Sequence, residues 1–177
     1  MEFLENNDNY PEDRFDKYGL SLILGTREMR PVDIAKLYIG LANYGKVSNL
    51  KYTLIEDKPK EYQQFSRGAS YLTLETLSRV VRPGNEKLYS EQRPISWKTG
   101  TSYGMKDAWS VGVSPDYTVL VWLGNFNQKS IFSLSGVETA GNLLFKVFNI
   151  VDINSKTFEK PTDDLKEIEI DEKTGYR

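Results

Sequence analysis

The sequence predicts an α+β fold in which helices flank an antiparallel sheet. Residues 95–124 contain runs with strand-like alternation of side chains, separated by two turn sequences. On both sides of this stretch, apolar residues recur at the spacing of an α-helix. The chain has 177 residues, of which 39% are hydrophobic and 27% charged, so it is long enough to bury the core of one globular domain.

The first predicted helix spans residues 31–44. Pro31 suits the first helical position, Asp33 favours the positive start of a helix, and Gly45 can end the helix in a left-handed conformation. Its apolar stripe consists of Ile34, Leu37, Tyr38 and Leu41. A second helix is predicted over 69–82, because Pro83-Gly84 stops it. Its expected inward side chains are Leu72, Leu77, Val80 and Val81.

Three strands follow, at about 95–102, 107–114 and 117–124. Turns at 103–106 and 114–116 join them. In the third strand one face carries Tyr117, Val119, Val121 and Leu123, and the other carries Leu120 and Trp122. Both faces of this strand therefore need a cover. A closing helix at about 136–151 can cover one of them with the stripe Val137, Ala140, Leu144, Val147, Phe148 and Val151.

Composition excludes several kinds of chemistry. The chain contains no histidine and no cysteine, which removes the commonest transition-metal ligands, thiol nucleophiles and histidine acid–base catalysis. We expect no metal and no cofactor. The net charge is -2, so nothing global favours nucleic acid as a partner. No stretch resembles a signal peptide or a membrane anchor.

The predicted chemistry lies in Trp97-Lys98-Thr99-Gly100-Thr101-Ser102, on the first strand of the sheet. A lysine supplies a cation and the threonines supply hydroxyls, which together can hold a carboxylate. A glycine allows close approach of a ligand, and a backbone N–H can face a developing oxyanion. A Lys-Thr-Gly triplet alone is weak support, because such a tripeptide occurs often by chance.

The chain resembles class A penicillin-binding proteins of the 1C type over roughly residues 15–177. The similar stretches are 18–25 (Tyr-Gly-Leu-Ser-Leu-Ile-Leu-Gly), 30–38, 41–45, 95–104, 107–113, 121–125, 163–165 and 174–176. In penicillin-recognising serine enzymes the Lys-Thr-Gly triplet lies on a strand beside the active site, together with Ser-x-x-Lys and Ser-x-Asn motifs.

The resemblance implies an incomplete penicillin-binding transpeptidase fold. Residues 1–152 would be the C-terminal part of that domain, and 153–177 a polar linker or acidic tail toward a further domain. The longer protein would be a serine-type D,D-transpeptidase that cross-links peptidoglycan stem peptides, is acylated by β-lactams and works outside the cytoplasm, at the periplasmic face of the inner membrane.

The resemblance also implies roles for single residues. Lys98 would hold a hydrogen-bond network and attract the substrate carboxylate, while Thr99 and Thr101 would offer hydroxyls to it. The Thr101 backbone N–H would form half of the oxyanion hole, Gly100 would leave room for the acyl chain, and Ser102 would complete the substrate-binding strand. The alternative is structural: a solvated lysine, threonines typical of strands and a glycine at a bulge.

The nucleophilic serine is not expected in this chain. The family places Ser-x-x-Lys and Ser-x-Asn before the segment that begins at Tyr18, where too few residues remain. Ser48-Asn49-Leu50-Lys51 has the first spacing, but it follows a helix-ending glycine and is predicted as strand or loop, where positions i and i+3 point to opposite faces. A truncated or degenerate non-catalytic binding module therefore stays open as an alternative function.

Two protein partners are also expected. One is the missing N-terminal part of the same domain, which in the family pairs with strand 117–124. Without it, that apolar edge invites a second copy of the chain, giving a homodimer. Alternatively, the segment 1–16 covers the edge and keeps the chain monomeric.

Overall fold

The computed structural model describes residues 19–54, 60–89, 93–152 and 156–175. Its main sheet has three antiparallel strands in the order β3-β4-β5. These are β3 (Ser96–Thr101), β4 (Asp107–Val113) and β5 (Thr118–Gly124). A second antiparallel sheet pairs β1 (Lys46–Ser48) with β2 (Glu61–Gln63). The α+β class and the three strands agree with the sequence prediction, with bounds shifted by a residue or so.

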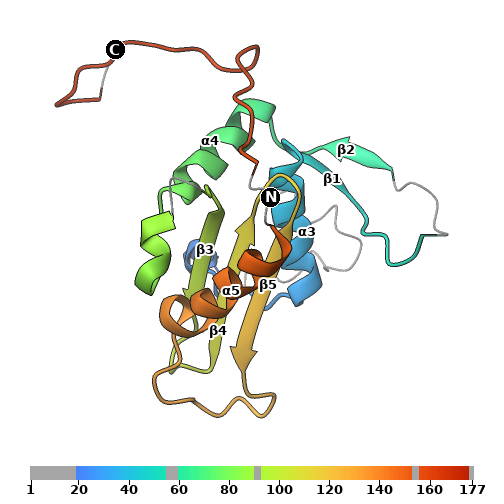
Figure 1. The fold of residues 1–177 in the computed structure, drawn as a ribbon, viewed down its shortest axis with the longest axis vertical. Coiled ribbons are helices and arrows are strands. Elements are labelled where there is room, and N and C mark those ends of the chain that lie inside the picture. The colour runs from blue at the N-terminus through green and yellow to red at the C-terminus, as the bar shows by residue number, and fades with distance from the viewer. Residues whose placement is uncertain (1–18, 55–59, 90–92, 153–155, 176–177) are drawn as a thin grey trace.

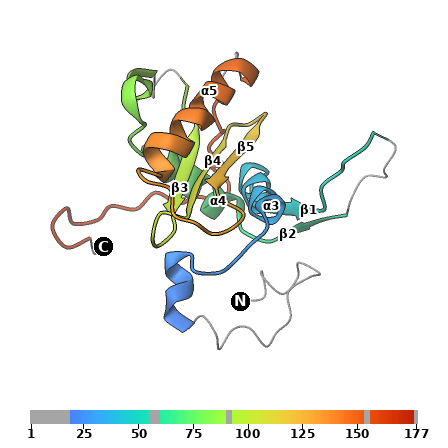
Figure 2. The ribbon, with the colours of Figure 1, turned by 90° about the horizontal axis from the view of Figure 1, so that it is seen from below.

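Helices cover both faces of the main sheet (Figure 1). The helices of the described residues are η2 (Gly19–Leu24), α3 (Pro31–Ala42), α4 (Arg67–Ser78), η3 (Gly84–Tyr89), η4 (Gly136–Gly141) and α5 (Asn142–Val151). Of these, α3, α4, η4 and α5 contact the main sheet. The π-helix η4 runs directly into α5, and the two lie on one face of the sheet. Figure 2 shows α5 on one side of the strands, with α3 and α4 on the other.

The core lies between α5 and the sheet. It is built from Ile95, Trp97, Ala108, Val121, Leu134, Ala140, Leu144, Phe145 and Phe148. Trp97 and Phe145 are both fully buried and meet edge to face, with ring centroids 5.0 Å apart. At Gly112 a side chain would collide with α5, because an added Cβ would lie 2.7 Å from Phe148. The glycine therefore sets how closely α5 approaches β4.

The predicted helix 31–44 is α3, which ends two residues earlier. Pro31 is its first residue, and Asp33 forms an ion pair with Arg30 at 2.7 Å. Gly45 adopts the left-handed conformation expected of it, with φ of +85°. The helix and its termination are therefore explained by local sequence alone.

The predicted helix 69–82 is α4, and here the inward face was predicted wrongly. The helix begins at Arg67 because Ser66 caps it, accepting a hydrogen bond from the Ala69 N–H at 3.1 Å. Its buried residues are Gly68, Ser70 and Leu74, whereas Leu72, Val80 and Val81 are exposed. At Gly68, α4 packs closely against residues 164 and 165 of the same chain, which leaves no room for a larger side chain. The spacing of the apolar residues therefore predicted the wrong inward face.

The closing helix 136–151 is confirmed as the continuous pair η4 and α5. Ala140, Leu144 and Phe148 are buried as predicted, while Val137 and Val151 are each 37% exposed. The apolar stripe predicted from the sequence did not include Phe145, which lies between Leu144 and Phe148 in the chain and is also buried.

Residues 156–165, here called the strap, pack across the ends of α3 and α4 (Figure 1). The Tyr44 hydroxyl donates to the Glu159 carbonyl at 2.9 Å and accepts from its N–H at 2.8 Å. The Asp164 carboxylate accepts from the Gly68 N–H at 2.6 Å, and Pro161 is buried. The first half of the expected polar linker is thus fastened to the helices.

Candidate active site

The Lys-Thr-Gly triplet lies on β3, a strand that pairs only with β4 among the described residues. The Ser102 N–H donates to the Asp107 carbonyl at 2.9 Å, which fixes the phase of the ladder. Because hydrogen-bonded and non-bonded pairs alternate in an antiparallel ladder, the N–H and C=O of Thr99 and Thr101 point to the outer edge of β3. A backbone donor at Thr101 therefore faces away from the sheet.

Lys98 lies on the same face of β3 as Gly100, toward the side of α3 and α4. Its side chain is exposed, and the ammonium donates to the Thr99 carbonyl at 2.6 Å. That carbonyl is free to accept because it lies outside the ladder with β4. The cation is thus held at the outer edge of the strand, beside the outward groups of Thr99.

Gly100 is exposed, and the space above it is open. An added Cβ would meet only the Trp109 Cβ, at 4.0 Å. A ligand could therefore approach the backbone closely at this point.

Thr101 is held from the other face by η4. Its hydroxyl accepts a hydrogen bond from the Gly136 N–H at 2.9 Å, which leaves the hydroxyl proton available to another acceptor. Gly136 itself needs to be a glycine, because an added Cβ would lie 2.7 Å from the Gly100 carbonyl oxygen. Sequence reasoning missed Gly136, since nothing in the sequence places it beside β3.

Ser102 lies at the end of the strand and takes part in a polar network. Its hydroxyl contacts an Asp107 carboxylate oxygen at 3.0 Å and accepts from the Asp107 N–H at 2.8 Å. The other carboxylate oxygen accepts from the Trp122 indole N–H at 3.0 Å. The structure therefore places Ser102 in the closure of the β3–β4 hairpin, next to Thr101 but with its hydroxyl engaged by Asp107.

Buried contacts fix β3 from behind. The Ser96 hydroxyl donates to the Leu74 carbonyl of α4 at 2.6 Å, and the Trp97 indole N–H donates to the Val80 carbonyl at 3.1 Å. The Arg82 guanidinium lies 5.0 Å from the centre of the Phe145 ring, and burial lowers its pKa to about 10. These contacts hold β3 in place.

Ser48 does not lie on the main sheet that contains β3. It is the last residue of β1 and does not begin a helix. This agrees with the sequence, which predicted strand or loop at this position. The neighbouring Asn49 accepts from the Lys36 ammonium at 2.8 Å. The geometry in which a lysine one helical turn away takes a serine proton is absent here.

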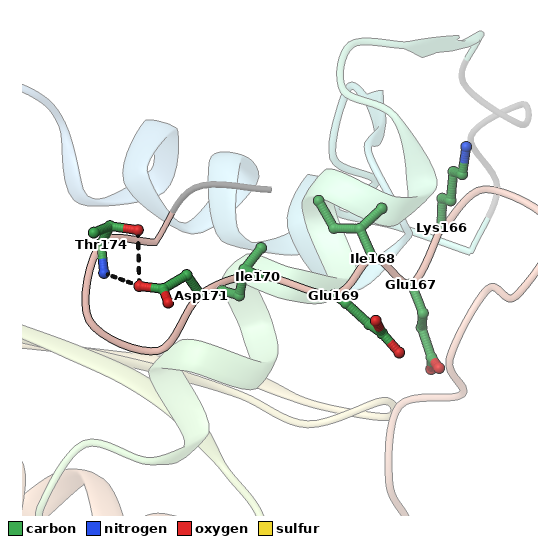
Figure 3. A pocket seen from close by; sticks show the side chains of 7 residues that line it. All are labelled: Lys166, Glu167, Ile168, Glu169, Ile170, Asp171 and Thr174. Atoms are coloured by element: carbon green, nitrogen blue, oxygen red, sulfur yellow. Dashed lines mark hydrogen bonds between the residues drawn. The ribbon is translucent and has the colours of Figure 1, made fainter.

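A pocket lies in the tail of the chain and includes no residue of β3 (Figure 3). One continuous segment lines it: Lys166, Glu167, Ile168, Glu169, Ile170, Asp171 and Thr174. Within the described part of the chain, no group of three acidic, histidine or cysteine side chains could hold a metal ion. Nor does any described helix have both the length and the apolar character needed to cross a membrane.

Comparison with known proteins finds that the chain is similar in sequence and in structure to penicillin-binding proteins. No protein-family profile matches the chain. Penicillin-binding protein 1C of Escherichia coli (strain K12) is 34% identical over 134 residues, which are 75% of this chain and 17% of that protein. Penicillin-binding protein 1A of Clostridium novyi (strain NT) is 28% identical over 92% of this chain and 20% of its own length. The chain thus spans a fifth or less of these relatives.

A solved structure shows the same fold. The crystal structure of penicillin-binding protein 1A from Haemophilus influenzae matches with a TM-score of 0.67 and 16% identity, over 90% of this chain and 32% of that chain. The fold is therefore α+β and similar to that of penicillin-binding transpeptidases. The sequence similarities support the penicillin-binding protein family at modest identity. They do not single out the 1C type, since 1A and 1B proteins match as well.

Proposed function

We propose that this chain is the C-terminal part of a peptidoglycan D,D-transpeptidase domain of the 1C type, within residues 1–152. It supplies the Lys-Thr-Gly strand of the active site. The observation that carries the proposal is the outer edge of β3, where the Lys98 ammonium and the outward N–H of Thr101 lie on one strand. A cation and a backbone donor in this order suit a peptide carboxylate and, beyond it, the carbonyl under attack.

In this proposal each residue has a defined role. Lys98 attracts the terminal carboxylate, and Thr99 and Thr101 donate their hydroxyls to it. Gly136 supports the role of Thr101, because its N–H occupies one lone pair of that hydroxyl and leaves the proton for the ligand. Gly100 gives the acyl chain room, and Ser102 holds the strand end. The serine that is acylated comes from outside this chain.

The partners follow from the same proposal. The ligands are peptidoglycan stem peptides and, in the longer protein, β-lactams, at the periplasmic face of the inner membrane. The upstream part of the same domain pairs with β5, and without it a second copy does so. Residues 153–177 are the polar linker or tail that leads toward a further domain in the longer protein.

Labelling with a fluorescent penicillin tests the proposal. We expect the chain alone to form no covalent adduct on a denaturing gel, since it lacks the acylated serine. A labelled band that Ser48→Ala removes would instead make Ser48 a nucleophile. In a longer protein that contains the upstream motifs, Lys98→Ala should lower the acylation rate at least about tenfold. Acylation unchanged by this substitution would remove Lys98 from the site.

A further inference from the structure

The strand β3 is held at its two ends by different elements. At its last residue, the Thr101 hydroxyl accepts from the Gly136 N–H of η4 at 2.9 Å. At its first residue, the Ser96 hydroxyl donates to the Leu74 carbonyl of α4 at 2.6 Å, and both residues are only 1% exposed. Lys98 follows Ser96 by two residues and lies on the same face of the strand. The position of Lys98 therefore depends on where α4 lies.

Apolar packing fixes the position of α4 only weakly. Its buried residues are Gly68, Ser70 and Leu74, of which Leu74 alone has a large side chain. The buried Ser70 hydroxyl has no hydrogen-bond partner among the described residues, so it does not tie the helix to its neighbours. Small side chains bury little apolar area, and they hold a helix in place less firmly than leucine or phenylalanine would. Polar contacts at the ends of α4 therefore matter more for its position.

The strap supplies such a contact at the first turn of α4. The Asp164 carboxylate accepts from the Gly68 N–H at 2.6 Å, and a Cβ added at Gly68 would lie 2.6 Å from the Asp164 carbonyl oxygen. A carboxylate at this place also interacts favourably with the positive start of the helix. The strap is itself tied to the end of α3, because the Tyr44 hydroxyl bonds to both backbone groups of Glu159. Asp164 therefore offers α4 an acceptor whose position is fixed.

The helix α4 connects this contact to β3. From Gly68 to Leu74 the distance along the axis is roughly 9 Å, because each residue of an α-helix adds about 1.5 Å. A helix of this length moves largely as one body, since its backbone hydrogen bonds join each turn to the next. A change in the position of its first turn therefore reaches the Leu74 carbonyl and, through it, Ser96.

We propose that Asp164 is a positioning residue for the Lys-Thr-Gly strand, and that through α4 and Ser96 it sets the position of Lys98. This inference rests on the proposed function, in which Lys98 attracts the carboxylate of the ligand. The strap then does more than connect the transpeptidase domain to a further domain, because it also supports the strand that binds the ligand.

Amide NMR shifts of the labelled full chain test the structural step. We expect Asp164→Ala to shift the amides of residues 96–98 and to leave those of 118–124 in place. Asp164→Asn keeps an acceptor without the charge, so it should shift the same amides in the same direction by a smaller amount. Asp163→Ala is the matched control, because its exposed ion pair with Arg67 ends at the same helix, and it should leave residues 96–98 unchanged. A residue that only adds stability would not move the amides of a distant strand in the folded state.

Acylation by a fluorescent penicillin tests the functional step, in the longer protein that contains the upstream motifs. Gly136 still holds Thr101 in the variants, so the N–H of Thr101 stays in place. We therefore expect Asp164→Ala to raise the half-saturating penicillin concentration about threefold and to leave the maximal acylation rate unchanged. Asp164→Asn should give a smaller rise, and Asp163→Ala none. Partial unfolding would instead lower the amount of labelled protein without changing the half-saturating concentration.

The outcomes separate this inference from the proposed function. If Lys98→Ala lowers acylation while Asp164→Ala behaves like Asp163→Ala, the positioning role is overturned and the proposed function stands. If Lys98→Ala leaves acylation unchanged, the proposed function fails, and this inference fails with it. Unmoved amides at 96–98 in both Asp164 variants would overturn the inference alone, even where stability falls. A lower maximal rate at an unchanged half-saturating concentration would contradict the route through Lys98.

Discussion

Removing the Asp164 carboxylate should destabilise the fold more than removing its neighbour Asp163. Asp164 accepts from the N–H of Gly68, a buried residue in the first turn of α4, at 2.6 Å. Asp164→Ala takes away this acceptor and a negative charge at a helix start, which together cost about 1–2 kcal/mol. Asp163 forms an ion pair with Arg67 at 2.7 Å, but both side chains are at least half exposed. Asp163→Ala should therefore cost about 0.5 kcal/mol or less.

Urea unfolding of the two variants beside the unmodified chain measures the difference. For a chain of this length, 1 kcal/mol corresponds to a shift of about 2–4 °C in Tm, so a thermal scan serves as a second measurement. Asp164→Asn keeps an acceptor without the charge and should fall between the alanine variant and the unmodified chain. Equal losses for Asp164→Ala and Asp163→Ala would show that the strap does not cap α4.

Two further predictions concern self-association and pH. The Ser114 N–H donates to the Tyr117 carbonyl at 2.9 Å, which fixes the alternation of hydrogen bonds between β4 and β5. The backbone groups of β5 that point away from β4 are therefore those of residues 118, 120, 122 and 124. We expect a dimer through this edge by light scattering at micromolar concentration, and Leu120→Pro should yield monomers because it removes an outward donor; a monomeric unmodified chain contradicts the pairing. Burial raises the pKa of Tyr38, so the folded state holds this proton at a pH where the unfolded state has lost it. The free energy of unfolding should then fall as pH rises above about 10, and Tyr38→Phe should flatten that slope in alkaline urea titrations; an unchanged slope would exclude Tyr38 as its source.

Elements with local signals were predictable from the sequence. Pro31 and Gly45 mark the ends of α3 by their own backbone preferences, and the alternation in 117–124 assigns each side chain of β5 to the correct face. The position of the triplet on a strand followed from the same alternation. Such features depend on residues close in sequence, so a single chain reveals them.

Features that depend on distant residues were not predictable. The inward face of α4 is set by close packing at Gly68, where an added Cβ would lie 2.6 Å from the Asp164 carbonyl oxygen. The contact between Gly136 and Thr101 joins residues 35 positions apart. The strap resembles a solvated linker in composition, and only the partners Tyr44 and Gly68 show that it is fastened.

The two outer strands of the main sheet differ in a way that bears on assembly. β5 carries no charged residue, whereas β3 presents the Lys98 ammonium at its outer edge, against the Thr99 carbonyl. A lysine on an edge strand discourages pairing with another chain, because its charge would be buried. If the proposed dimer forms through the outer edge of β5, the lysine on β3 would limit association to a closed pair. If Lys98 were replaced by an uncharged residue, both β3 and β5 could pair with strands of other copies. Copies could then add edge to edge into a continuous fibre.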